Sequence, residues 1–190
     1  MLRYYTLVGS RQTPENALMD LTTLANLLAR CGWVGRSGGA DGADSCLEDG
    51  CRGLSTAKME VYLPWNGFNN RWADGKNYID TPKLQTYKQA QEIASKTHPA
   101  WDNIKRDGTP VLSKGVKSLH TRNVYQVLGK DLKTPSELLL CWAETTKDGV
   151  KGGTNTAVQL AKENGAIIIN LYNIEYDEAI VKLSNNGFIY

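Results

Sequence analysis

Two short runs of almost unbroken apolar residues constrain the fold of this chain most strongly. Residues 137–142 read ELLLCW and residues 166–171 read AIIINL. Runs of this length, rich in leucine and isoleucine, are typical of strands that are buried on both faces of a sheet. Because such a strand needs a covering layer on each side, these runs predict a sheet between two layers of helices.

The rest of the chain supplies further strands and the helices to cover them. Residues 2–8 form an apolar β-type run, residues 33–36 a shorter one, and residues 58–63 alternate until Pro64. Helical spacing or composition predicts helices over 14–30, 41–54, 82–96, 116–128, 154–164 and 176–183. This alternation predicts an α/β fold of three layers, with a mainly parallel sheet of five or more strands in a single domain.

Residues 65–116 interrupt this alternation. Aromatic side chains are scattered there among asparagine, glycine, aspartate and lysine, around one expected helix. We therefore expect an insertion or a lid over residues 65–116 of a domain that otherwise spans 1–190.

Composition restricts the partners and the compartment. The formal net charge of +2 is too small for a dedicated duplex-DNA binder, so we do not expect nucleic acid to be the partner. Four cysteines without a CxxC pair and only two histidines predict neither a metal site nor a cofactor. With no apolar stretch of membrane-spanning length and no leader-like N-terminus, we expect a cytoplasmic protein with reduced thiols and no membrane partner.

The ends of the predicted strands carry the residues that suggest a ligand site. In a parallel sheet, ligands bind beyond the carboxyl ends of the strands, near the point where the strand order reverses. The residues expected there are Gly9, Ser10 and Arg11 after the first strand, Ser37, Gly38, Gly39, Ala40 and Asp41 after the second, Pro64, Trp65 and Asn66 after the third, Trp142, Ala143 and Glu144 at the end of the fourth, and Asn170 at the end of the fifth.

Glycine-rich turns before helices indicate what these residues could hold. Gly38 and Gly39 leave room for a phosphate against the main chain, and the helix that follows directs N–H groups at it. A third turn, residues 151–156, offers N–H groups, the hydroxyls of Thr154 and Thr156, and the Asn155 amide. The alternatives are a tight strand-to-helix turn for the glycine pair and a helix N-cap for Thr154.

Charged and aromatic residues complete the expected site. Arg11 would meet a bound phosphate, with a surface salt bridge as the alternative, and Asp44 would accept hydrogen bonds from ribose, with helix capping as the alternative. Trp65 and Trp142 offer surfaces for base stacking, or else packing for the core. Spacing alone leaves open whether Arg122 faces the site or the solvent.

Three segments together resemble a known superfamily. GSR at 9–11, SGGADGAD at 37–44 and GGT at 152–154 are similar to the SLOG superfamily, particularly its YspA/YpsA-like branch, with DprA and LOG proteins as more distant relatives. The resemblance covers roughly 2–64 and 117–183. It implies a Rossmann-like domain that binds nucleotides or nucleotide-derived ligands, often as a homo-oligomer, and a viral origin would place it in the host cytoplasm.

The LOG relatives also imply an activity, from which this chain departs. They cleave the N-glycosidic bond of nucleoside monophosphates with an arginine and a glutamate, and the resemblance assigns the arginine to Arg122. Gln159 stands where the glutamate is expected, and a neutral amide can neither act as a base nor stabilise an oxocarbenium-like charge. Binding without this cleavage is therefore favoured, unless Asp41, Asp44 or Glu144 supplies the carboxylate.

These observations leave three candidate functions. The first is binding of a nucleotide-derived signal, such as an ADP-ribose derivative or a cyclic nucleotide, in order to sense or sequester it. The second is an N-glycosidase or phosphodiesterase that uses Arg122 with one of the three acids. The third, implied by the DprA likeness, is single-stranded DNA binding, with residues 65–116 as a stacking groove.

Overall fold

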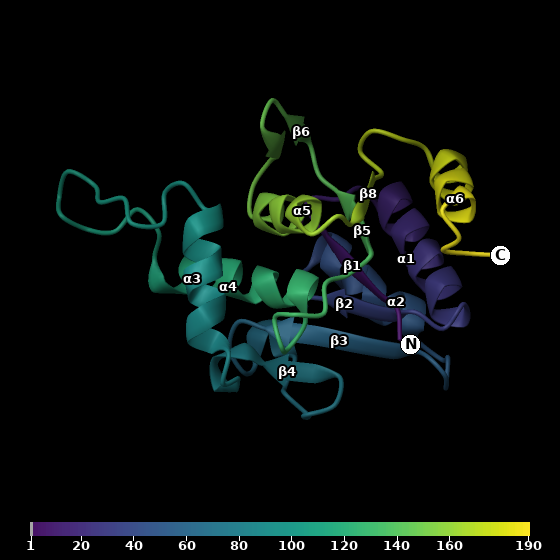
Figure 1. The fold of residues 1–190 in the computed structure, drawn as a ribbon, viewed down its shortest axis with the longest axis horizontal. Coiled ribbons are helices and arrows are strands. Elements are labelled where there is room, and N and C mark those ends of the chain that lie inside the picture. Colours follow the sequence, from purple (N-terminus) through teal and green to yellow (C-terminus); the bar gives the residue numbers. More distant parts are fainter. Residues whose placement is uncertain (1) are drawn as a thin grey trace.

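A six-stranded parallel sheet lies between two layers of helices (Figure 1). The computed structural model describes residues 2–190. The strands, in spatial order, are β4 (Tyr78–Asp80), β3 (Lys58–Leu63), β2 (Val34–Ser37), β1 (Tyr4–Gly9), β5 (Leu138–Trp142) and β8 (Ile167–Asn170). The expected Rossmann-like α/β fold with a parallel sheet is confirmed.

Each face of the sheet is covered by its own helices. One core joins Tyr5 and Leu7 of β1 to α1 (Glu15–Arg30), α2 (Cys46–Cys51) and α6 (Tyr176–Asn185). The opposite core joins Val8, Leu139 and Cys141 to three further helices, namely α3 (Tyr87–Thr97), α4 (Lys114–Leu128) and α5 (Thr154–Glu163). The alternation of side chains along β1 and β5 therefore separates the two layers, as the apolar strand sequences require.

The helix expected over 41–54 is shorter and begins differently. A single 3-10 turn, Gly42–Ser45, precedes α2. Gly42 has a φ of +78°, which an α-helix cannot include, and Arg52 is extended, which ends α2. The other helices lie within a few residues of the expected ranges.

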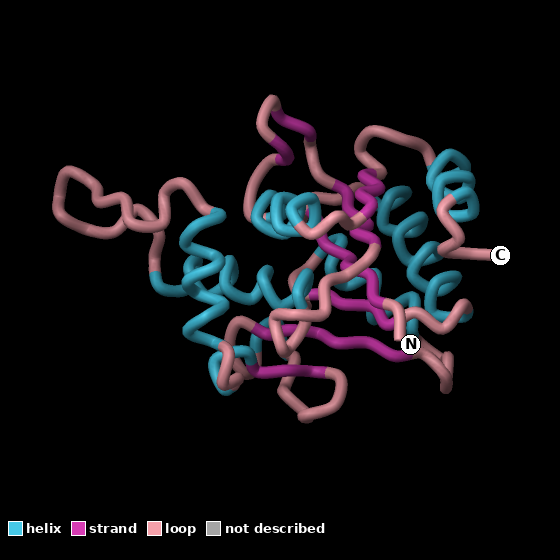
Figure 2. Tube along the Cα trace, in the orientation of Figure 1, coloured by secondary structure: helices cyan, strands magenta, loops and turns pink. Residues whose placement is uncertain are grey.

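Residues 65–116 are only partly an insertion. Tyr78–Asp80 pairs with β3 in parallel and becomes the edge strand β4, and α3 packs into the second core. The part that stands apart is the loop between α3 and α4, which projects from the body of the molecule (Figure 2). A second small feature, the antiparallel hairpin of β6 (Thr145–Thr146) and β7 (Gly149–Val150), follows β5 and was not predicted.

The order of the strands indicates where a ligand site would lie. From β1 the chain moves outward through β2, β3 and β4, and it then returns to the other side of β1 to form β5 and β8. The strand order therefore reverses between β1 and β5, which pair in parallel from Tyr5–Leu138 to Gly9–Trp142. Two loops that diverge to opposite sides of the sheet leave a crevice at such a point.

Gly42 allows the loops after β1 and β2 to meet. A Cβ atom on Gly42 would lie 2.4 Å from the Ser10 carbonyl oxygen and 2.7 Å from the Arg11 Cα atom. The Ala43 N–H donates to the same Ser10 oxygen at 3.2 Å, which fixes this contact.

Substitution Gly42→Ala is expected to destabilise the fold by about 2–4 kcal/mol, because it combines an unfavourable positive φ with crowding against backbone atoms. Gly53→Ala is the matched control, since Gly53 has a φ of +76° but, its chain neighbours apart, no atom of residues 2–190 lies within 4 Å of the position that a Cβ would take. It should cost only about 1 kcal/mol. Urea unfolding measures both values, and equal losses would contradict the crowding at Gly42.

Candidate functional site

A cavity of about 590 Å³ lies at the reversal point between β1 and β5. Its walls come from the loop after β1, the loop after β5, the N-terminus of α5 and one side of α4. The polar residues among those that line it are Ser10, Arg11, Gln12, Asp44, His120, Arg122, Asn123, Gln126, Glu144, Lys151 and Thr154.

The loop after β1 forms one wall and is held by its own backbone. The Ser10 N–H donates to the Trp142 carbonyl at 3.0 Å, and the Ser10 hydroxyl accepts from the Gln12 N–H at 3.0 Å. Arg11 is exposed beside this turn and makes no ion pair with any residue of 2–190. Its guanidinium is thus free to meet an anion in the cavity.

Another wall is the start of α5. Gly152 has a φ of +76°, and the chain turns there into the helix, whose first N–H groups have no partner within the helix. The Gly153 carbonyl accepts from the Asn123 amide at 2.8 Å, which anchors this turn on α4. A helix N-terminus carries partial positive charge and therefore favours an anion.

A buried ion pair forms the floor. The Arg122 Nη1 atom lies 2.7 Å from the Asp44 Oδ2 atom, and the two side chains are only 6% and 5% exposed. Arg122 occupies the space above Gly38, where a Cβ atom would overlap its Nη1 at 1.1 Å. In the amide orientation that satisfies both of its ends, Gln126 accepts from the Gly38 N–H at 2.7 Å and donates to the Asn123 Oδ1 atom at 2.8 Å.

His120 lies beside this pair and is held in a fixed orientation. Its Nδ1 atom is 2.8 Å from the Thr156 hydroxyl, and its ring packs edge-on against His98 with 4.3 Å between centroids. Burial lowers the pKa of His120 to about 4, and the charges of His98 and Arg122 act in the same direction. His120 is therefore neutral at physiological pH, and in residues 2–190 its Nε2 atom has no hydrogen-bond partner.

The outer rim is more exposed and partly aromatic. Lys151 and Glu144 form an exposed ion pair at 2.9 Å, which raises the pKa of Lys151. The rings of Trp142 and Tyr172 meet edge to face, with 5.2 Å between centroids, and Tyr172 is 46% exposed. At this rim, aromatic side chains lie next to an ion pair whose attraction is weakened by solvent.

The structure brings together many of the residues expected at the site. Those that line the cavity are Gly9, Ser10, Arg11, Ala40, Asp44, Arg122, Trp142, Ala143, Glu144, Gly152, Gly153 and Thr154. Those that do not line it are Ser37, Gly38, Gly39, Asp41, Trp65, Asn66 and Asn155.

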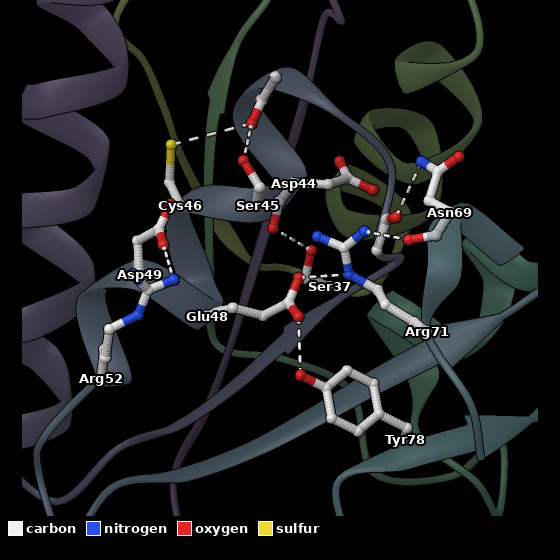
Figure 3. Close-up of polar contacts among 12 residues, drawn as sticks. Ser37, Asp44, Ser45, Cys46, Glu48, Asp49, Arg52, Asn69, Arg71 and Tyr78 are labelled. Carbon is white, nitrogen blue, oxygen red and sulfur yellow. Dashed lines mark hydrogen bonds and ion pairs between the residues drawn. The ribbon is translucent and has the colours of Figure 1, made fainter. Parts of the chain in front are cut away.

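The glycine pair and Asp44 make close contacts within the protein. Gly38 makes room for the Arg122 guanidinium, where a phosphate was expected. Gly39 lies under Arg71, and its carbonyl accepts from Asn69 at 3.2 Å (Figure 3). The Oδ2 atom of Asp44 is paired with Arg122, and Asp44 also lines the cavity.

The loop that contains Trp65 and Asn66 is fastened to the side of the site. Arg71 donates to Glu48 at 2.7 Å, and Glu48 accepts from the Tyr78 hydroxyl at 2.7 Å (Figure 3). Asn66 accepts from the Ala73 N–H at 2.8 Å. These contacts tie the loop to α2 and β4, and none of residues 65–77 lines the cavity.

Gln159 also lies away from the cavity lining. Its amide nitrogen donates to the Asp148 carbonyl at 2.8 Å and to the Asn155 Oδ1 atom at 3.2 Å, and Asn155 also accepts from the Val150 N–H. Gln159 and Asn155 therefore fasten the β6–β7 hairpin to α5. The sequence comparison of Gln159 with a catalytic glutamate did not anticipate this structural role.

Several lining residues were not predicted from the sequence. Gln126 and Asn123 are buried on α4, and their helical spacing from His120 and Arg122 was the available signal. Gln12 and Tyr172 sit in loops without a distinctive motif, so only the fold reveals them.

Comparison with known proteins identifies the fold. No family model and no curated protein matches the sequence. A structure of DNA processing protein A from Helicobacter pylori, described for its unique single-stranded DNA binding mode, aligns over all of this chain and 74% of its own, with 20% identity and a TM-score of 0.50. DNA processing protein A (DprA) from Streptococcus pneumoniae aligns over 89% of this chain and 58% of its own, with 13% identity and a TM-score of 0.37.

The Helicobacter comparison corrects one expectation. The small net charge led us not to expect nucleic acid as a partner, and this expectation was wrong because a protein of the same fold is described as binding single-stranded DNA. Net charge reports on the whole surface, whereas a single DNA strand contacts a limited part of it.

None of the helices in residues 2–190 is both long and apolar enough to cross a bilayer.

The low pKa of His120 predicts a loss of stability in acid. Its pKa falls from a usual 6.5 to about 4 in the folded protein, so between these values the unfolded chain binds more protons and stability falls as the pH is lowered. This group alone contributes a loss of at most about 3 kcal/mol. Urea unfolding at several pH values should show a shallower acid loss for His120→Gln; an unchanged profile would contradict the assignment.

Breaking the buried ion pair is expected to be costly. Asp44→Asn leaves the Arg122 charge buried without a counter-charge and should destabilise the fold by about 3 kcal/mol, and adding Arg122→Met should recover part of the loss. Asp49→Asn is the control, because the Asp49–Arg52 pair is exposed and should contribute about 0.5 kcal/mol or less. Comparable urea midpoints for the two single variants would contradict a buried pair.

Proposed function

We propose that this protein binds single-stranded DNA at the carboxyl edge of its sheet, with a phosphate group seated in the cavity between β1 and β5. The observation that carries the proposal is that hydrogen-bond donors gather around this cavity: Arg11, which makes no ion pair in residues 2–190, and the start of α5 both line it. The likeness in fold to a DNA processing protein A described as binding single-stranded DNA supports it.

The donors suit a phosphodiester. A phosphate oxygen accepts hydrogen bonds from backbone N–H groups at a helix N-terminus, from hydroxyls and from arginine. The start of α5, the Ser10 and Thr154 hydroxyls and Arg11 supply these groups from both sides of the crevice. The Arg122–Asp44 pair shapes the floor beneath them.

The aromatic rim suits the bases. Base stacking on aromatic side chains contributes roughly 1–3 kcal/mol per base and tolerates any sequence. Trp142 and Tyr172 line the cavity next to the proposed phosphate seat. A nucleotide whose phosphate meets Arg11 could therefore lay its base against this rim.

A small nucleotide-derived ligand is the second candidate, and the volume of the cavity supports it. A volume of about 590 Å³ falls within the range of sites that enclose ligands of drug size. Like a DNA strand, an ADP-ribose derivative or a cyclic nucleotide presents phosphate groups and a base. Competition separates the candidates, because a dedicated small-molecule site would bind the free nucleotide far more tightly than an oligonucleotide.

The proposal also includes three further expectations from the sequence. They are one folded domain over 1–190, membership of the YspA/YpsA-like branch with a phage origin, and binding in preference to cleavage. The carboxylates that line the cavity are Asp44 and Glu144, and each makes an ion pair, Asp44 with Arg122 and Glu144 with Lys151. This pairing supports binding in preference to hydrolysis.

Arg11→Ala is expected to weaken the binding of a short oligothymidylate by about tenfold at low salt and to reduce the slope of log K against log salt by about 0.7, the value for one phosphate contact. Arg30→Ala is the control, because Arg30 lies at the far end of α1 and bonds to Asn26. Fluorescence anisotropy measures both. Equal affinities for Arg11→Ala and the wild type would contradict the phosphate seat.

A further inference from the structure

The loop between α3 and α4 forms an ordered hairpin. The Lys105 N–H donates to the Thr109 carbonyl and the Val111 N–H to the Asn103 carbonyl, both at 2.8 Å, and Ile104 and Pro110 form an antiparallel bridge. We call residues 103–111 the projecting hairpin. Figures 1 and 2 show it reaching away from the body of the molecule, beside the top of α3.

The base of the hairpin is anchored and its tip is not. Trp101 is 9% exposed and belongs to the second core, and the Lys117 Nζ atom lies 5.1 Å from the centre of its indole. Leu112 packs against the same core on the other side of the hairpin. The residues between them extend beyond that core.

The tip combines two free cations with exposed apolar surface. Lys105 and Arg106 are exposed, and neither makes an ion pair with any residue of 2–190. Ile104 beside them is 69% exposed. The one acid of the tip, Asp107, is engaged by the Thr109 N–H at 3.0 Å and the Thr109 hydroxyl at 2.6 Å.

Charge is concentrated in this part of the chain. Residues 98–117 contain four lysines and arginines against two aspartates, a net charge of +2 that equals the net charge of the whole chain. The remainder of the protein is therefore neutral on balance. Residues 98–117 therefore form a basic segment that carries the two free cations of the projecting hairpin, and such a segment complements a polyanion.

The hairpin is joined directly to the cavity wall. Its second strand leads through Ser113 into α4, and α4 supplies Val116, Leu119 and Arg122 to the cavity lining. The hairpin also lies on the side of the molecule toward which the strands of the sheet run (Figure 1). A DNA strand that runs from the cavity along α4 would therefore approach the projecting hairpin.

We propose that the projecting hairpin is a second contact for single-stranded DNA, in which Lys105 and Arg106 bind phosphates beyond those held in the cavity and Ile104 packs against a base. This inference rests on the proposed function, since the cavity would hold the first part of the strand. The free cations and the charge of residues 98–117 favour a polyanion over a protein partner.

The test compares oligothymidylates of two lengths. An oligonucleotide of about eight residues fills the cavity region alone, whereas one of about twenty-five residues also reaches the hairpin. Lys105→Glu combined with Arg106→Glu should weaken binding of the long oligonucleotide by about tenfold or more and lower its salt slope by about 1.4, because two phosphate contacts are lost. Binding of the short one should be unchanged.

The matched control reverses two charges elsewhere. Lys58→Glu with Lys133→Glu makes the same change in net charge at exposed lysines near the amino ends of β3 and β5 and should leave most of the long-oligonucleotide affinity intact. Ile104→Ser keeps the charge and should weaken only the long oligonucleotide. Circular dichroism should show the same thermal midpoint for the hairpin variants as for the wild type.

The outcomes separate this inference from the proposed function. Wild-type affinity of the hairpin variant for the long oligonucleotide overturns the second contact and leaves the cavity proposal standing. An equal loss for both lengths also overturns it, because the hairpin would then act through the cavity. If the wild type binds neither oligonucleotide, the proposed function fails and the second contact fails with it.

Discussion

The buried ion pair between Arg122 and Asp44 is the interaction on which the arrangement of the site depends. Arg122 belongs to α4 on one face of the sheet, and Asp44 belongs to the turn before α2 on the other. The pair therefore joins the two helical layers at the carboxyl edge of the strands. It needs Gly38, because any side chain at that position would displace the guanidinium.

Such a pair is a poor source of net stability. Removing two charges from water costs several kcal/mol for each ion, and their mutual attraction seldom returns more than it costs. The Nε atom of Arg122 is also buried without a partner in residues 2–190. The pair is better understood as fixing geometry: it holds α4 in register with the loop after β2, so that His120, Asn123 and the start of α5 form one wall of the cavity.

The sequence predicted most of this architecture because the apolar strands 137–142 and 166–171 allow few alternatives to a covered parallel sheet. It missed β4, which has only three residues in polar surroundings, and the β6–β7 hairpin, whose strands have two residues each. At the site, the rule about strand ends brought together residues from three loops. It could not reveal that a side chain 84 positions away fills the space above Gly38, because a contact between distant segments leaves no local pattern.

In the proposed complex, single-stranded DNA occupies the cavity between β1 and β5. Hydrogen–deuterium exchange with and without a short oligothymidylate tests it most directly, because the proposed phosphate seat includes backbone N–H groups. Binding in the cavity should slow exchange at residues 9–12 and 152–155 and change it little at the amino ends of the strands. Protection elsewhere, with residues 9–12 and 152–155 exchanging as in the free protein, would contradict it.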